Sequence, residues 1–153
     1  GKKSAPIHII EFSDLECGHC KKAYVAMKGL IRKFKGDIYF EYRHYPLPFH
    51  PFAKKFAKAS VCAGEQKKFF EYIEISFANQ KKLSKIQPVD LAERLNLDKA
   101  TFESCMNEPY AQNVVDADFN EGNRLEVEST PTFFINGYIF VGIPTEADLL
   151  AYY

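Results

Sequence analysis

The stretch Ile7-His8-Ile9-Ile10-Glu11-Phe12, followed closely by Cys17-Gly18-His19-Cys20, decides the fold of this chain. The first segment is short and almost wholly apolar, which predicts a β-strand that is buried on both faces. From Gly18 onward apolar residues recur at helical spacing, and Gly36 supplies a stop signal; the apolar positions are Ala23, Met27, Leu30, Ile31 and Phe34. The two cysteines are therefore expected at a junction between a strand and a helix.

This junction favours a reactive thiol. The first turn of a helix has backbone N–H groups without intrahelical partners and carries the positive end of the helix dipole, so it stabilises negative charge on the sulfur of Cys17. Cys20 lies three residues further on, on the same face of the helix and within reach of a disulfide bond. A thiol pair in this position suits thiol–disulfide exchange.

The cysteine motif has two other interpretations. A Cys-x-x-Cys segment is also half of a zinc site, but such a site needs a second Cys-x-x-Cys or a Cys/His pair at ligand spacing. Cys62 and Cys105 stand alone and the four histidines form no such pattern, so no metal site is expected. A purely structural disulfide between Cys17 and Cys20 would close a very small loop and constrain the unfolded chain little.

Two neighbours of the cysteines are candidate functional residues. A ring N–H or an imidazolium at His19 would stabilise the Cys17 thiolate and make it a better leaving group, whereas a solvent-facing His19 would have no role. Glu11 lies six residues before Cys17 on an otherwise apolar strand. Burial there would raise the pKa of the carboxyl group and let it pass protons to or from a buried Cys20; the alternative is a strand-end Glu paired with a surface Lys.

The composition indicates one globular domain. The chain has 153 residues, of which 46% are hydrophobic and 15% aromatic, enough for a substantial core. Its net charge is zero, so no overall charge attracts nucleic acid. Residues 1–90 carry 17 Lys/Arg against 9 Asp/Glu, and residues 91–153 carry 3 against 11; we interpret this uneven distribution as ordinary solvated faces.

No stretch approaches the roughly 18 apolar residues of a membrane span, and the start lacks the apolar core of a signal peptide, so a soluble, mature or trimmed chain is expected.

The remaining elements follow in a simple order. Residues 38–45 resemble a strand, which completes a β-α-β unit with the cysteines at the head of its helix. Residues 51–125 are predicted to be helical only, with helices over 51–62, 66–77, 88–95 and 109–125 and a short one after Asp98.

The last part of the chain is predicted to return to the sheet. Strands over 132–135 and 138–141 are joined by Asn136-Gly137, the strongest short-range hairpin signal, and Pro144-Thr145 opens a final helix from Glu146 toward Tyr152. The predicted fold class is therefore α/β. It is a thioredoxin-like sheet from residues 6–50 and 126–153, with a helical domain of residues 51–125 inserted between its β-α-β and β-β-α halves, all within a single domain of residues 1–153.

The order of these segments resembles the DsbA-like thiol–disulfide oxidoreductases of the thioredoxin superfamily. The resemblance extends from Pro6 to the final helix and is carried by Glu11-Phe12-Ser13-Asp14-Leu15-Glu16-Cys17-Gly18-His19-Cys20 and by Ser129-Thr130-Pro131-Thr132-Phe133-Phe134-Ile135-Asn136-Gly137. It implies that Cys17 is the nucleophile and that Cys20 resolves the mixed disulfide. It also implies that Thr130 and Pro131 form a cis-proline loop that faces the thiols and binds the substrate chain. The alternative for Pro131 is a strand-start proline without a role.

The resemblance has a further implication for the other two cysteines. Cys62 and Cys105 fall on separate predicted helices, and DsbA-like proteins often carry a disulfide between helices of the insertion. Parity with the reactive pair favours this connectivity among three, and the bond would stabilise the fold by about 3–5 kcal/mol. Two buried free cysteines are the alternative.

The expected function is a dithiol oxidase that introduces disulfides into unfolded or reduced substrate proteins. A disulfide isomerase or reductase of the same fold is the alternative, because Gly18-His19 and Thr130 before the proline are similar to those enzymes. A chaperone-like binding module for unfolded chains is the alternative from another class. No cofactor beyond the Cys17–Cys20 disulfide is expected, and His8, His44 and His50 are interpreted as structural. Arg43 is left outside the site.

The resemblance and the cysteines also suggest the setting in which the protein works. We expect a periplasmic or otherwise extracytoplasmic location, with the signal segment absent from this chain, and a membrane redox partner that reoxidises or reduces Cys17–Cys20. A monomer is expected, since no dimerisation segment precedes Ile7, and no nucleic acid partner is expected.

Overall fold

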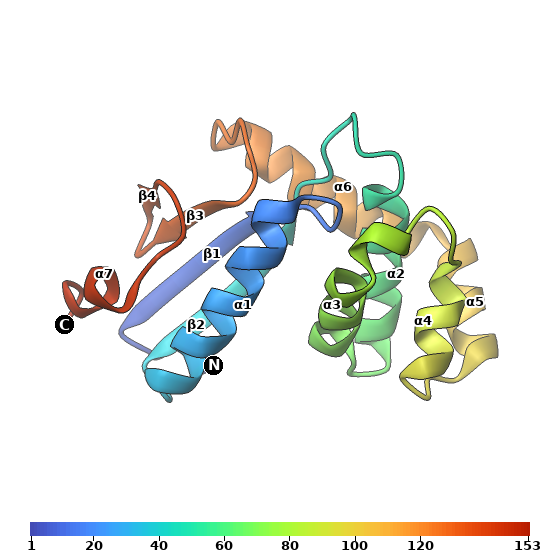
Figure 1. Ribbon diagram of the computed structural model, residues 1–153, viewed down its shortest axis with the longest axis horizontal. Helices are drawn as coiled ribbons and strands as arrows, with labels where there is room; N and C mark the ends of the chain where they lie inside the picture. Colours follow the sequence, from blue (N-terminus) through green and yellow to red (C-terminus); the bar gives the residue numbers. More distant parts are fainter.

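A computed structural model describes all 153 residues of the chain (Figure 1). A four-stranded sheet has the order β2-β1-β3-β4. Strand β1 (Ile7–Ser13) is parallel to β2 (Ile38–His44) and antiparallel to β3 (Thr132–Ile135), which pairs with β4 (Tyr138–Phe140). The β-α-β unit and the β-β hairpin predicted from the sequence are therefore confirmed. The first and the last parts of the chain meet in the middle of the sheet.

The two faces of β1 pack against different helices. Ile7, Ile9, Glu11 and Ser13 face α1 (Gly18–Lys33) and are at most 1% exposed. Phe12 faces the other way and packs with side chains near the end of α6, including Phe119 and Leu125. This second face is covered only near the carboxyl end of the strand, so His8 and Ile10 are half-buried. The expectation of a strand buried on both faces was therefore wrong for its first half.

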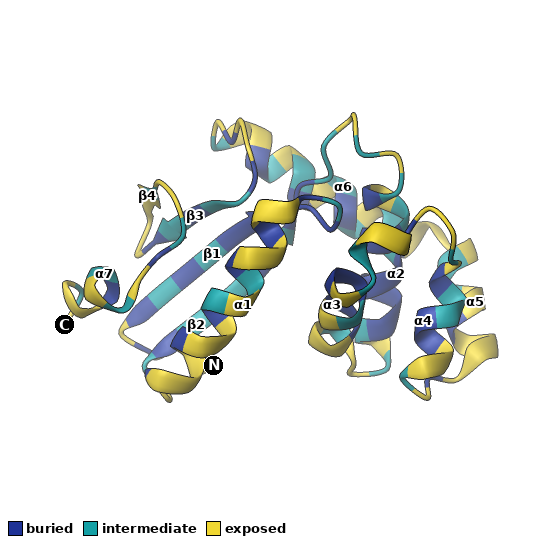
Figure 2. Cartoon of the chain, in the orientation of Figure 1, coloured by how far each residue is buried: buried dark blue, intermediate teal, exposed yellow.

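A block of helices separates β2 from β3. It contains α2 (Ala53–Glu65), α3 (Phe69–Ala78), a short 3-10 helix η1 (Gln80–Lys82), α4 (Pro88–Arg94), α5 (Lys99–Asn107) and α6 (Pro109–Arg124). Figure 1 shows α2 to α5 beside the sheet, with α6 leading back to β3. The apolar residues of these helices face one another, and their exposed residues face outward (Figure 2). The helical insertion is thus present and has a core of its own.

The helix boundaries differ most from the prediction between α2 and α3, where α2 runs to Glu65 instead of residue 62; the last helix also ends earlier than predicted, at Leu150. The helix expected from Gln66 begins instead at Phe69, because Lys67 has a φ of 64° and turns the chain between α2 and α3. The last helix, α7 (Glu146–Leu150), begins as expected after Thr145, whose hydroxyl accepts the N–H of Asp148. This is a standard N-cap that satisfies one free donor of the first turn. None of the helices combines the length and the apolar character needed to cross a membrane.

Candidate active site

Cys17 is the N-cap residue of α1. Strand β1 ends at Ser13, and the chain then turns so that the N–H of Cys17 donates to the carbonyl oxygen of Asp14 at 3.1 Å. The backbone of Cys17 is extended, with φ −81° and ψ 121°, and the helix starts at the next residue. Its sulfur therefore lies at the positive end of a 16-residue helix, as the sequence predicted.

The surroundings of Cys17 stabilise its thiolate. They lower the pKa of this thiol to about 5, with the neighbouring thiol of Cys20 as the largest cause; Thr130 and the backbone N–H groups of Cys20 and His19 add to it, against the opposing effect of burial. The Cys17 sulfur lies 3.6 Å from the carbonyl oxygen of Thr130, to which the thiol donates when it is protonated. At neutral pH Cys17 is largely ionised, and its sulfur lies against the loop before β3.

Cys20 is the opposite kind of thiol. It is completely buried, and burial raises the pKa of its thiol far above the ordinary range, an effect that the Cys17 sulfur increases. Its sulfur accepts the N–H of Asp14 at 3.4 Å. One thiol of the pair is therefore anionic and 9% exposed at the start of the helix, while the other is neutral and completely buried.

Glu11 lies beneath this pair and is itself buried. Only 1% of the residue is exposed, and burial is the main reason why the pKa of its carboxyl group is raised to about 8, to which the charge on Cys17 contributes. Neither carboxyl oxygen has a hydrogen-bond partner; the nearby Ser13 hydroxyl opposes the shift without forming a hydrogen bond of normal geometry. The alternative of a Glu paired with a surface Lys is therefore wrong.

The loop before β3 completes the site. The Thr130–Pro131 peptide bond is cis, Thr130 is 9% exposed and Pro131 is half-buried. The carbonyl contact with Cys17 joins residues that are 113 positions apart in the sequence. The fold therefore brings together five of the six residues predicted for catalysis and substrate binding, namely Glu11, Cys17, Cys20, Thr130 and Pro131.

His19 is the sixth of these residues. It is exposed, and its side chain forms no hydrogen bond to Cys17. The backbone N–H of His19 is what helps to stabilise the thiolate in this structure. An electrostatic effect of the imidazole on Cys17 stays a prediction.

Acidic residues of the active-site turn hold the helical block in place. One oxygen of buried Asp14 accepts the N–H of Leu47 at 2.7 Å and contacts the ring of His50 at 2.9 Å. Glu16 accepts the N–H groups of Phe52 and Ala53, at 2.7 and 2.8 Å, where α2 begins. A carboxylate at a helix N-terminus is favourable. The motif contained both acids, but nothing in the sequence indicated these partners.

Gln80 holds the same turn from the other side. Its amide nitrogen donates to the carbonyl oxygens of Leu15 and Cys17, each at 2.9 Å. Gln80 belongs to the 3-10 helix between α3 and α4, which the sequence did not predict. The helical block thus supplies a direct contact to the backbone of the reactive cysteine.

The other two cysteines form a disulfide between α2 and α5. The Cα atoms of Cys62 and Cys105 are 5.7 Å apart, and the residues are separated by 43 positions. Cys62 is 1% exposed, in the core of the helical block. The interpretation of these residues as two free cysteines is therefore wrong. Arg43 is occupied by Glu41 and Asp118 on the opposite face of β2, away from the thiols.

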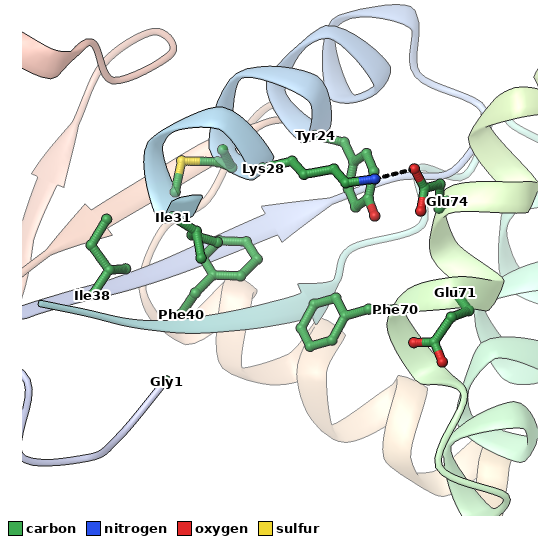
Figure 3. Close-up of a pocket in the computed structure, with 10 residues that line it drawn as sticks. Gly1, Tyr24, Lys28, Ile31, Ile38, Phe40, Phe70, Glu71 and Glu74 are labelled. Atoms are coloured by element: carbon green, nitrogen blue, oxygen red, sulfur yellow. Dashed lines mark hydrogen bonds and ion pairs between the residues drawn. The ribbon is translucent and has the colours of Figure 1, made fainter. Parts of the chain in front are cut away.

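An apolar pocket of about 370 Å³ lies away from the thiols, between α1, β2 and α3 (Figure 3). Ile31, Phe40 and Phe70 contribute apolar surface, and the ion pair between Lys28 and Glu74 spans its rim. None of the residues discussed above for the reactive site lines this pocket. It is therefore separate from the candidate active site.

Known proteins with similar sequences or structures place this arrangement in a family. The profile of a family described as Thioredoxin matches residues 1–152. The structure of Pseudomonas aeruginosa DsbA2 has a TM-score of 0.83 at 25% identity and covers 99% of this chain and 88% of that chain. The oxidised form of BdbD from Bacillus subtilis has a TM-score of 0.81 at 22% identity, with 99% and 87% covered.

A curated relative has a different kind of name. The Na(+)/H(+) antiporter NhaA 1 of Salinispora arenicola is 33% identical over 138 residues, which are 90% of this chain. The chain spans only about a fifth of that protein's length, 21%. Because the family profile matches residues 1–152, the chain belongs to the thioredoxin family. Its two thiols, cis-proline loop and helical block give it the fold of the DsbA-like thiol–disulfide oxidoreductases.

Proposed function

We propose that this protein exchanges disulfides with substrate proteins through Cys17 and Cys20, and that it works mainly as an oxidase. The observation that carries the proposal is the opposite state of the two thiols. The pKa of Cys17 is lowered to about 5 at the start of a helix, whereas Cys20 is buried and its pKa is raised. Such a pair supplies one nucleophile or leaving group and one resolving thiol.

The reaction balances without a cofactor. A substrate thiolate attacks the Cys17 sulfur of the Cys17–Cys20 disulfide, the bond between the two cysteines breaks, and Cys20 leaves and takes up a proton. A second substrate thiolate then attacks the substrate sulfur of the mixed disulfide, and Cys17 leaves as a thiolate. The substrate loses two electrons and gains a disulfide, while the cysteine pair is reduced.

The direction of net transfer follows from the stability of the products. Every contact that stabilises the Cys17 thiolate stabilises the reduced protein, which raises the reduction potential of the pair. Isomerase or reductase activity remains the alternative, supported by Gly18-His19 and by Thr130 before the proline. We further propose an extracytoplasmic location and a membrane redox partner, because an oxidase must be reoxidised in a compartment that permits disulfides.

Substrate binding is assigned to the cis-proline loop. The carbonyl of Thr130 lies against the reactive sulfur, and Pro131 has no N–H to donate. An extended chain held along this loop would pair its backbone with the protein and bring its own sulfur to Cys17. A chaperone-like module would use the same surface without the thiols, which makes the two functions separable by substitution.

The test is covalent trapping. Cys20→Ser should accumulate a mixed disulfide with reduced, denatured ribonuclease A after mild oxidation, because the resolving thiol is gone, and Cys17→Ser should accumulate none. The complexes would be separated on non-reducing gels and identified by mass. Iodoacetamide should label Cys17 in the reduced wild type and leave Cys20 unlabelled. No complex with Cys20→Ser, or equal labelling of both thiols, would refute the exchange mechanism.

A further inference from the structure

Unpartnered polar groups gather at one place in this molecule. The buried side-chain oxygens without a hydrogen-bond partner belong to Glu11, Ser13, Tyr42 and Thr130, all at the reactive site. An unpartnered buried polar group costs about 1–3 kcal/mol, and such groups in a native structure often have a catalytic role. The sequence predicts that Glu11 exchanges protons with Cys20. The function proposed above gives no role to the hydroxyl groups of Ser13, Tyr42 and Thr130.

Ser13 lies on the same face of β1 as Glu11, next to the turn that contacts the buried thiol of Cys20. Residues two apart on a strand point to the same face, so Glu11 and Ser13 both face α1, and Ser13 is one step closer to the active-site turn. The next residue, Asp14, donates its N–H to the sulfur of Cys20 at 3.4 Å. Ser13 is 0% exposed, so no bulk water reaches this side chain.

The pKa shifts of Glu11 and Cys20 agree with a position of the Ser13 hydroxyl group near both. Burial raises the pKa of both Glu11 and Cys20, and in each case the Ser13 hydroxyl opposes the effect of burial. The Ser13 hydroxyl group is thus a neighbour of both groups, and in the structure it forms no hydrogen bond to either, so it is free to turn toward each of them. A hydroxyl can accept a proton on its oxygen while it donates its own.

We propose, on the basis of the exchange function proposed above, that the Ser13 hydroxyl relays the proton between the Glu11 carboxyl group and the Cys20 sulfur. When a substrate thiolate breaks the Cys17–Cys20 bond, Cys20 leaves with the electron pair. Its sulfur takes the hydrogen of the Ser13 hydroxyl, and the Ser13 oxygen takes the proton of Glu11. Cys20 becomes a neutral thiol, Glu11 a carboxylate, and Ser13 is unchanged.

Several titratable or charged groups face the Glu11 carboxyl group, so their states decide whether they contribute to the same pH dependence. On β2, burial raises the pKa of Tyr42 well above its usual value and lowers that of His44 to about 3. On the turn, Asp14 is paired with His50. The loop residues Thr130 and Pro131 carry no charge. On α1 the two thiols do not titrate in the oxidised protein, which is the form that the substrate attacks.

The experiment measures how fast dithiothreitol reduces the oxidised protein. Samples are quenched in acid at set times and the free thiols are counted by mass after alkylation; the rate is divided by the concentration of dithiothreitol thiolate. In the wild type this rate constant should fall as pH rises through the pKa of Glu11, which burial raises far above its usual value. In Ser13→Ala it should be roughly 10- to 100-fold lower at pH values where Glu11 is protonated, and independent of pH.

A double variant and a matched control complete the design. Because both residues serve one relay, Glu11→Gln and Glu11→Gln/Ser13→Ala should be equally slow. Ser76→Ala removes another buried serine hydroxyl, one that donates to the Tyr72 carbonyl oxygen in α3, and should react like the wild type. Loss of the unpartnered Ser13 hydroxyl should not lower the melting temperature.

Two results would overturn the relay. One is a Ser13→Ala protein with the rate and pH profile of the wild type; the other is a double variant whose slowing is the product of the two single effects. Failure of the proposed function would look different, since the wild type would then resist reduction and Cys20→Ser would trap no substrate. The relay and the exchange function are thus tested separately.

Discussion

The two cysteine pairs of this protein differ in state and in setting: Cys62 and Cys105 form a disulfide, whereas Cys17 and Cys20 are free thiols. Cys17 and Cys20 are three residues apart at the start of α1, next to backbone N–H groups and above a buried carboxyl group. Cys62 and Cys105 are 43 residues apart and join two packed helices. The length of the closed loop decides how much a disulfide stabilises the fold, and the surroundings decide whether its sulfurs react.

The largest effect should come from removing the pair in the helical block. Cys62→Ala/Cys105→Ala should lower the free energy of unfolding by about 4 kcal/mol, because the lost bond closes a long loop. Urea unfolding would measure the loss, with both proteins in the same Cys17–Cys20 redox state. The rate at which iodoacetamide alkylates reduced Cys17 should be unchanged. A variant that keeps its stability but loses Cys17 reactivity would reverse the roles of the two pairs.

Glu11 should have the next largest effect, with a gain in stability. Its folded pKa of about 8 lies above the usual 4.5, so between these values the native state holds a proton that the unfolded state has released. Folding stability therefore falls as pH rises through this window, and Glu11→Gln removes the loss, which is about 3 kcal/mol at pH 7.

Oxidised protein is the suitable form for this measurement, since Cys17 does not titrate there. The difference in unfolding free energy between Glu11→Gln and the wild type should be small at pH 5 and grow as pH rises toward the raised pKa of Glu11. A difference that does not vary with pH would show that the carboxyl group is not buried in its neutral form. Slower exchange by the more stable variant would mark Glu11 as a functional residue that costs stability.

A third comparison is between the two redox states of the wild type. The folded pKa of Cys17 is about 5, below the usual 9.0, so the thiolate stabilises the reduced protein fully above pH 9 and the contribution disappears as pH falls through 5. At pH 8 this contribution is about 2 kcal/mol after allowance for solvent screening. The small loop of the Cys17–Cys20 bond offsets little of it.

We therefore expect the reduced protein to melt at a higher temperature than the oxidised protein at pH 8, and the difference to shrink toward pH 5. Calorimetry of both forms, with Cys62–Cys105 intact in each, measures it. A higher melting temperature for the oxidised form at pH 8 would favour a reductase and leave the exchange chemistry unaffected.

The sequence was most informative where function depends on local order. The Cys-x-x-Cys spacing after an apolar strand located Cys17 at a helix start, and the Asn136-Gly137 hairpin located the second half of the sheet. Glu11 was found because a charged residue on an apolar strand is conspicuous. Each of these signals lies within a short window of the chain.

What the sequence could not give were contacts between distant segments. Tyr42 is opposite Glu11 only because β1 and β2 pair in that register. Gln80 contacts the Cys17 carbonyl across 63 positions, from a 3-10 turn without a strong pattern. Ser13 was part of the quoted motif, but its unpartnered state appears only once the surrounding strands and α1 enclose it.

The smallest expected effect concerns His19 and tests how the reactive pair is tuned. The residue is exposed, so water screens its charge, and the thiolate already has the Cys20 thiol and backbone N–H groups as partners. His19→Ala should therefore raise the pKa of Cys17 by less than about one unit and lower the reduction potential by less than roughly 30 mV, making a weaker oxidant.

The thiolate absorbance near 240 nm, followed against pH in the reduced protein, measures the change in the pKa of Cys17. Equilibration with glutathione measures the change in the reduction potential, with Lys22→Ala on the same helix as a control for loss of a nearby positive charge. A shift of two units or more would mean that the imidazole, and not the Cys20 thiol with the backbone N–H groups, is the main source of Cys17 reactivity. The difference between the two cysteine pairs would then rest on one side chain.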